Sequence, residues 1–268
     1  MKFNTFIFIL LIILITSNTN AQTNTYRTSS GEMIFSFSDV KEYNNTTEKW
    51  DKVPAGMRYT IFFHIQQSLH VDFNNTFGFF TGLGIRNIGI TPAPDSIYSH
   101  SDKTYYKRAS AGASVYELTT VKQRVYTLGL PLALKIGNFK KGFYFFAGGE
   151  YEYSFHYKEK IWIDGKKQKS SSWFTDETTV LLPSVFGGVK FPGGTMLKFK
   201  WYLQNFLNKN HTADLVNPDK SVTSIKPYEY SNAQLFYVSI AFIIEHKKPK
   251  EKPEVEGTPT PSSPKIDM

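Results

Sequence analysis

The sequence predicts an all-β fold: an eight-stranded antiparallel up-and-down transmembrane β-barrel. Segments with an apolar residue at every second position recur along the chain, which indicates strands with one apolar face. Short turns and long loops alternate between these segments, and an apolar N-terminal segment indicates export. This order is typical of bacterial outer-membrane barrels, which have short periplasmic turns and long extracellular loops.

The first 21 residues have the features of a signal peptide that is cleaved after export. Lys2 supplies a positive start, residues 6–15 form an apolar run, and Ala21 ends a small-residue cleavage site. The alternative is a permanent N-terminal anchor, but the apolar run is too short to cross a bilayer as a helix. The sequence contains no cysteine, which excludes disulfides, thiolate metal sites and a lipid-anchored lipoprotein.

Composition narrows the class of protein further. Aromatic residues make up 16% of the chain, a supply that suits the aromatic girdles of a membrane barrel. The formal net charge is +8, but the lysines are scattered among acids rather than gathered in a nucleic-acid footprint. We therefore expect no nucleic-acid partner and a solvated basic surface, to which anionic lipid or polysaccharide could be attracted.

Eight strands are expected, separated by three tight turns and four long loops. The strands are at residues 31–38, 57–73, 77–90, 120–137, 142–157, 178–191, 195–206 and 232–245. The turns are at residues 74–76, 138–141 and 192–194, and the loops are at residues 39–56, 91–119, 158–177 and 207–231. Within the third loop, residues 161–166 resemble a small hairpin turn that lies beyond the membrane.

Pairing across the tight turns tests these strands, because a one-residue slip would exchange the two faces. The pairs expected are Gly188 with Lys198, Gly129 with Glu150, and Val71 with Phe79. In all three hairpins the apolar faces stay together, as a correct strand assignment requires.

Alternation alone does not say which face points outward. A soluble lipocalin-like carrier would enclose its apolar face, whereas a membrane barrel exposes it. Phenylalanines near the tight turns and tyrosines near the long loops share the apolar face, and small residues mix with large ones on the other. These features favour the membrane orientation, with a luminal polar network of Lys135, Glu150, Glu152, Lys190, Lys198 and Lys200. Because eight strands leave room only for side chains, we expect no diffusion pore.

The mature chain is predicted to consist of a barrel and a tail. The barrel domain would occupy residues 22–245, and residues 246–268 form a Lys/Pro-rich tail that cannot bury a core. An even number of strands returns the chain to the side on which it began, so both termini are expected in the periplasm.

Four segments resemble pieces of the PorT-like outer-membrane β-barrel family. They are residues 77–85, 126–135, 145–149 and 187–191, and the most telling is Leu-Pro-Leu-Ala-Leu-Lys at 130–135. The resemblance covers about residues 57–245. It implies an integral outer-membrane barrel of a Gram-negative bacterium, a family with some members implicated in a protein-secretion apparatus. It implies no catalytic residues.

The polar face also contains residue types that serve in catalysis. Glu150 and Glu152 lie two apart on one strand face, but salt bridges to luminal lysines explain them more simply than acid/base chemistry. His64, His70 and His156 are expected to face the lumen, and Ser68 lies near the first two. His64 and His70 are too far apart along the strand to share a metal. We expect no cofactor and no metal.

The leading hypothesis is a non-enzymatic anchor, scaffold or binding protein of the outer membrane. Besides the lipid bilayer, its expected partners are envelope or secretion-system proteins, or surface polysaccharide, bound through the outer loops or the periplasmic tail. The candidate loop contacts are Tyr98, Tyr105, Tyr106, Arg108, Tyr116 and Trp162. The alternatives are an outer-membrane lipid-modifying enzyme and a soluble lipocalin-like carrier.

Overall fold

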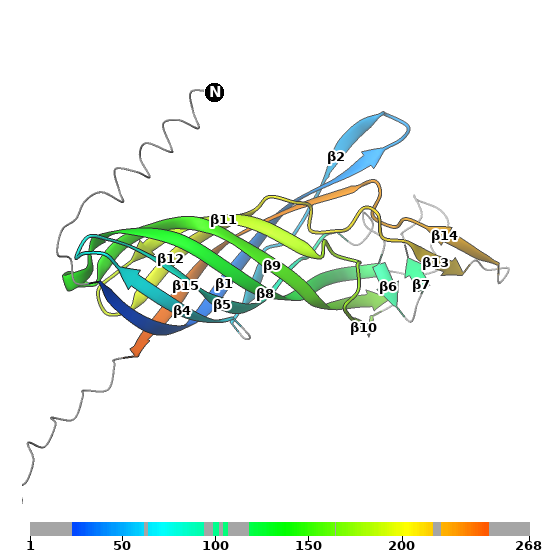
Figure 1. Ribbon diagram of the computed structural model, residues 1–268. Helices are drawn as coiled ribbons and strands as arrows, with labels where there is room; N and C mark the ends of the chain where they lie inside the picture. Colours follow the sequence, from blue (N-terminus) through cyan, green and yellow to red (C-terminus); the bar gives the residue numbers. More distant parts are fainter. Residues whose placement is uncertain are drawn as a thin grey trace, which may run out of the picture.

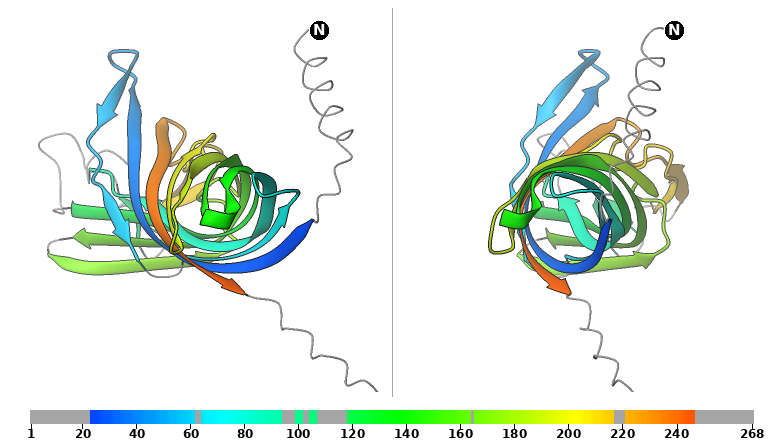
Figure 2. Two further views of the ribbon diagram at one scale, coloured as in Figure 1. Left: turned by 90° about the vertical axis from the view of Figure 1, so that its left-hand side faces the viewer. Right: turned by 60° about the vertical axis from the view of Figure 1, so that its left-hand side comes forward.

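Eight antiparallel strands pair in a closed ring (Figure 1, Figure 2). The computed structural model describes residues 23–61, 64–93, 99–101, 104–106, 118–163, 165–216 and 221–246. In ring order the strands are β1 (Asn24–Asn44), β4 (Ile65–Asp72), β5 (Phe77–Ile90), β8 (Leu118–Asn138), β9 (Phe143–Ile163), β11 (Leu181–Lys190), β12 (Thr195–Tyr202) and β15 (Ser231–His246). β15 pairs again with β1. The predicted eight-stranded antiparallel barrel is confirmed.

The segments predicted as long loops contain six short strands. These are β2 (Lys49–Val53), β6 (Ser99–Ser101), β7 (Thr104–Tyr106), β10 (Lys166–Trp173), β13 (Ala213–Val216) and β14 (Val222–Ile225). β1 runs on to pair with β2, and β9 runs on to pair with β10 across the predicted hairpin turn, where Gly165 has a φ of 72°. Much of the first and third predicted loops is therefore regular β-structure, because the β1–β2 and β9–β10 ladders continue beyond the barrel.

The predicted strand 57–73 is interrupted. Its first part, β3 (Arg58–Thr60), and its second part, β4, both pair with β1, but the registers of these two pairings differ by two residues. Among the described residues, no helix is long and apolar enough to cross a membrane. A single 3-10 turn, η1 (Phe139–Lys141), joins β8 to β9.

Two of the three predicted hairpin registers are confirmed. Gly188 pairs with Lys198 across the 192–194 turn. Val71 pairs with Phe79 across the 74–76 turn, where the Asn74 side chain accepts hydrogen bonds from two following backbone amides.

The third predicted register was wrong by two residues, since Gly129 pairs with Glu152 and not with Glu150. The Asn138 side chain accepts a hydrogen bond from the Lys141 amide, and Gly142 adopts a left-handed φ of 68°. The turn therefore begins one residue later than expected. A shift of two residues keeps every side chain on its predicted face.

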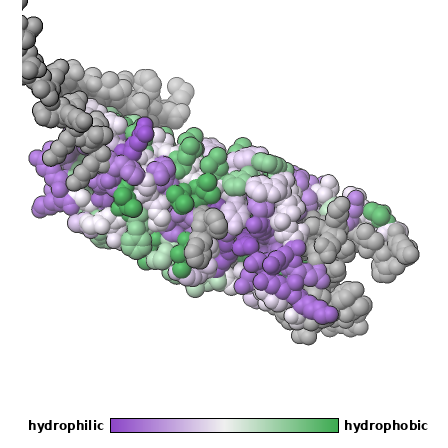
Figure 3. Space-filling model, turned by 90° about the horizontal axis from the view of Figure 1, so that it is seen from below, coloured by the Kyte–Doolittle hydropathy of each residue, from purple (hydrophilic) through white to green (hydrophobic). Residues whose placement is uncertain are grey.

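The apolar face of the barrel points outward. On β8, the exposed fractions of Leu130, Leu132 and Leu134 are 58%, 60% and 58%, whereas Lys135 is 1% exposed. Seen from below, hydrophobic residues gather over the middle of the barrel, and hydrophilic residues lie mainly towards its two ends (Figure 3). The prediction that the apolar face of the strands points outward is confirmed, whereas a lipocalin-like carrier would enclose that face.

The described chain begins and ends at the same end of the barrel. Arg27 of β1 pairs with His246 of β15 near the short turns, and the hairpin extensions project from the opposite end (Figure 1). The predicted signal peptide and tail lie outside the described residues, apart from His246.

Candidate functional site

The lumen of the barrel holds a group of six buried charged residues, which we call the central network. Its members are Glu32, Arg86, Glu150, Glu152, Lys198 and Lys200, none more than 5% exposed. Three carry positive charge and three carry negative charge, so the formal charges cancel. Burying a charge is costly unless it is paired, and this balance is what permits so many in one place.

Arg86 lies at the centre of the network. Its guanidinium donates hydrogen bonds to Glu150 and, at 2.5 Å, to the Gln66 side chain. It also lies 3.5 Å from a Glu32 oxygen and 3.7 Å from a Glu152 oxygen. The absence of a side chain at Gly129 makes room for it, because a Cβ there would lie 2.9 Å from the guanidinium.

The two lysines complete the pairing from the opposite wall of the barrel. Lys200 donates to both Glu150, at 2.7 Å, and Glu152. Lys198 donates to Glu32 at 2.6 Å. The two glutamates that could have formed an acid pair are thus held by the same ammonium group. They are arranged for ion pairing, as expected from the sequence.

Lys135 and Lys190 do not join the central network. Lys135 lies nearer the short turns, where it pairs with Asp72 and donates to the Tyr26 hydroxyl at 2.9 Å. Lys190 donates to the Gly142 carbonyl and pairs with Glu245, both at 3.3 Å. The structure therefore divides the six predicted luminal residues between a central group of four and these two lysines.

Apolar side chains lie on both sides of the central network. Towards the short turns is a cluster that includes Phe80, Phe146 and Phe186. Towards the long loops is a larger cluster that includes Ile34, Ile88 and Tyr237. Together with the ion pairs they fill the interior of the described barrel.

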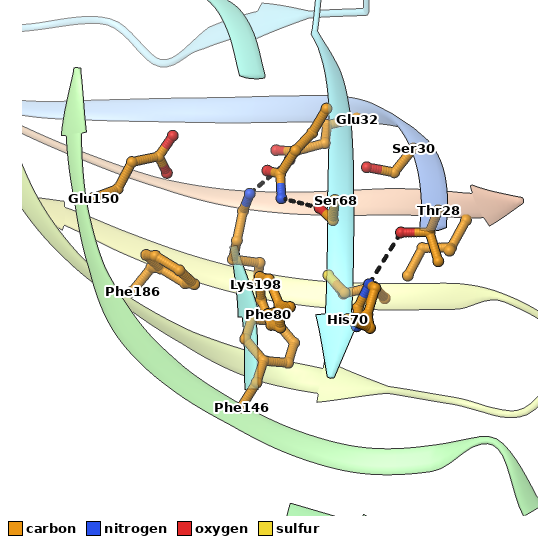
Figure 4. A pocket seen from close by; sticks show the side chains of 13 residues that line it. Thr28, Ser30, Glu32, Ser68, His70, Phe80, Phe146, Glu150, Phe186 and Lys198 are labelled. Carbon is orange, nitrogen blue, oxygen red and sulfur yellow. Dashed lines mark hydrogen bonds and ion pairs between the residues drawn. The ribbon is translucent and has the colours of Figure 1, made fainter. Parts of the chain in front are cut away.

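One small cavity lies between the central network and the phenylalanine cluster (Figure 4). Its volume is about 20 Å³, room for about one water molecule. Glu32, Lys198 and Ser68 approach it from the polar side, and Phe80 and Phe146 from the apolar side. A cavity of this size does not form a passage for solutes.

Arg86 and Glu32 were not among the predicted site residues. Strict alternation from Gly78 through Gly84 places Arg86 on the inner face, so the pattern of β5 contained the signal. Glu32 lies in the first predicted strand, residues 31–38. The pattern could not reveal that side chains from three other strands, β1, β4 and β9, meet at the Arg86 guanidinium.

The histidines are only partly where the sequence places them. His64 and His70 face the lumen and are each 2% exposed, as predicted. His70 hydrogen bonds to Thr28 at 3.0 Å, and the Ser68 hydroxyl accepts a bond from Gln66 at 2.8 Å. Among the hydrogen bonds of the described residues, none joins Ser68 to a histidine.

The prediction that His156 faces the lumen was wrong. Tyr126 pairs with His156 but Thr127 pairs with Ser154, so Phe155 is an extra residue, a β-bulge in β9. A bulge reverses the alternation beyond it. His156 therefore lies on the outer face, stacked on Trp173 with ring centroids 3.9 Å apart. The described residues bring no group of three His, Asp or Glu side chains together as a metal site.

Of the candidate loop contacts, Trp162 is the one whose side chain is described. It lies between Lys122 and Lys167, with each ammonium 5.5 Å from its ring centroid. Tyr105 and Tyr106 belong to the short strand β7. Tyr98, Arg108 and Tyr116 lie outside the described residues.

A scan against protein-family models finds no match, and neither does a search of curated proteins. Among solved structures, the chain is similar to Ail, the attachment invasion locus protein of Yersinia pestis, to Neisserial surface protein A, and to the outer membrane protein OprG from Pseudomonas aeruginosa.

The sequence identities to Ail, the Neisserial protein and OprG are 10%, 10% and 9%, and the TM-scores are 0.34, 0.32 and 0.32. The matches cover 82%, 83% and 82% of this chain and 99%, 97% and 95% of the three neighbours. The fold assignment does not depend on them, since it rests on the closed strand pairing of this chain.

Proposed function

We propose that the protein is an integral outer-membrane barrel that anchors a binding platform outside the cell, and that it is neither a channel nor an enzyme. The observation that carries the proposal is the inversion of an ordinary core. Aliphatic and aromatic side chains cover the outside of the barrel, and ion pairs occupy the middle of its interior, between two apolar clusters. Only a hydrocarbon environment makes that outer surface favourable.

The strand lengths support a platform beyond the membrane. β8 and β9 each span 21 residues. A tilted strand needs only about 9–11 residues to cross the hydrocarbon core. The remainder of these strands, with β10, forms a regular sheet that a bare anchor would not need.

The resemblance to the PorT-like family supports a scaffold in the cell envelope, with a protein-secretion apparatus as the candidate partner. Surface polysaccharide is a second candidate partner at the platform. In the proposed topology the short turns and both termini face the periplasm, and the organism is Gram-negative.

Single-cysteine labelling tests the topology directly, because the natural chain has no cysteine. Lys49→Cys on the β1–β2 hairpin and Lys140→Cys on a short turn both replace exposed side chains. We expect a membrane-impermeant maleimide to label Lys49→Cys in intact cells and Lys140→Cys only after lysis. Equal labelling of the two, or the reverse order, contradicts the topology.

Two measurements on the purified protein test the remaining parts of the proposal. The folded barrel should migrate differently on a denaturing gel before and after boiling. In planar bilayers it should give no steady conductance, because the described lumen is filled. A stable open channel would refute the anchor role while leaving the fold intact.

A further inference from the structure

The bulge at Phe155 has an effect on the charge of the outer surface. On the side of the bulge towards the short turns, which we call below, odd-numbered residues of β9 face outward, such as Tyr151 and Tyr153. Above the bulge, towards the long loops, even-numbered residues face outward, while Tyr157 and Glu159 turn inward and are 0% and 1% exposed. Without the extra residue, Glu159 would face outward and Lys158 and Lys160 would face the interior.

The outer face of β8, β9 and β10 is layered along the barrel axis. Uppermost in the apolar band, Leu128 pairs with Tyr153, which pairs with Leu181 of β11. The next row is aromatic, with Tyr126, His156 and Trp173 side by side across three strands. Rows two residues apart along a strand are separated by about 7 Å.

Above the aromatic row the surface is cationic. Arg124 pairs with Lys158, and in the next row Lys122 pairs with Lys160, which pairs with Lys169. Lys167 pairs with Trp162 in the row beyond. We call these six cations the basic face, and its members are Lys122, Arg124, Lys158, Lys160, Lys167 and Lys169.

The basic face has no counter-charge within the described part of the chain. Around it, none of the twelve outward positions of the three strands is acidic: 120, 122, 124 and 126 of β8, 156, 158, 160 and 162 of β9, and 167, 169, 171 and 173 of β10. No salt bridge joins any of the six cations to a described carboxylate. Like charges directly opposite one another destabilise a sheet. Partial burial and the neighbouring cations Arg124, Lys167 and Lys169 lower the pKa of Lys160.

We propose that the basic face binds the phosphate groups of outer-leaflet glycolipid. Its place in the layers argues for a lipid, because the cations begin one row above the aromatic side chains, where the polar head groups of a bilayer lie. Bound phosphate would offset the repulsion between the three lysines of one row. Trp173, which is 63% exposed, and the other two members of the aromatic row would contact the same lipid at its apolar boundary.

The inference rests on the proposed membrane location, and a binding assay on the purified full-length protein tests it separately. The barrel is held in a neutral maltoside detergent, and retention of diphosphoryl lipid A is compared with retention of the same lipid stripped of phosphate. The test variant combines Lys122→Gln, Lys160→Gln and Lys169→Gln. The matched control combines Lys41→Gln, Lys49→Gln and Lys52→Gln, which removes equal charge from the β1–β2 hairpin.

We expect the natural protein and the control to bind the phosphorylated lipid equally, and the test variant to bind it about 100-fold more weakly. Unchanged binding by the test variant overturns the proposal, as does equal binding of the dephosphorylated lipid. Preferential binding of a soluble sulfated polysaccharide, or displacement of the lipid by millimolar inorganic phosphate, would also overturn it, since the site would then not be a lipid site.

Two controls keep the outcome interpretable. Heat-dependent gel migration shows whether each variant is folded, and the comparison of the two lipids on the natural protein needs no variant at all. If lipid binding fails but the cysteine labelling is as expected, only the proposed lipid site at the basic face is refuted. If the labelling is reversed, the proposed membrane topology itself is refuted.

Discussion

Replacing Arg86 with methionine should destabilise the barrel more than any removal of a surface charge. The variant keeps a long side chain but leaves Glu32, Glu150 and Glu152 facing only Lys198 and Lys200. It also leaves an oxygen of Glu150 and the Gln66 side-chain oxygen without their donor. Breaking a buried ion pair by removing one partner costs about 3–5 kcal/mol.

The free energy of unfolding is measured by urea titration of the detergent-solubilised protein, followed by tryptophan fluorescence. The temperature at which the band of the folded barrel converts to the band of the unfolded chain on a gel should also fall, by about 10 °C. Lys41→Ala is the control, since Lys41 and Asp39 form an exposed pair at 3.3 Å. Exposed pairs are worth about 0–1 kcal/mol.

A double variant separates the charge from the packing. Arg86→Met with Glu150→Gln leaves two carboxylates and two lysines, so it should lose less stability than the sum of the two single variants. If Arg86→Met costs less than about 1 kcal/mol, or if the two losses simply add, charge balance is not what stabilises the lumen.

Two further predictions concern the outside of the barrel and the extracellular end. Leu132→Lys places a charge on the apolar exterior and should lower the stability of the barrel by about 2–4 kcal/mol or block its insertion into the membrane. Val222→Lys, at an equally exposed position of the β13–β14 hairpin, should insert normally. Equal insertion of the two variants would contradict a lipid-facing surface at Leu132. Glu177, between β10 and β11, has its pKa raised to about 8 by burial and by the nearby carboxylates Glu159 and Asp176. In the folded protein Glu177 keeps its proton up to about pH 8, whereas in the unfolded chain it loses the proton at its ordinary pKa of 4.5. The contribution of Glu177 to stability is therefore fully present below pH 4.5 and is lost as the pH rises to about 8. Limited proteolysis should therefore cut the loops faster at pH 8 than at pH 5.5. Glu177→Gln should abolish that difference, while Glu229→Gln, which replaces an exposed acid, should retain it. A pH dependence that persists in Glu177→Gln would show that Glu177 is not the group responsible.

The sequence by itself determined the number of barrel strands and, over most of their length, which residues share the apolar face. These properties are local: a period of two in β8 is present in residues 128–136 whatever the strand pairs with, and the turn at 192–194 fixes its register from neighbouring residues. For the same reason Lys135, Glu150 and Lys200 could be placed in the lumen before any contact was known.

The tertiary structure alone decided how those faces meet. The period-two pattern has no mark for an added residue, so it could not reveal the bulge at Phe155 or the outward turn of His156. The central position of Arg86 depends on side chains that lie up to about 120 residues from one another in the chain and meet across the lumen only when the ring closes. The basic face is likewise assembled from three strands, because lateral pairing brings together lysines that the sequence keeps apart.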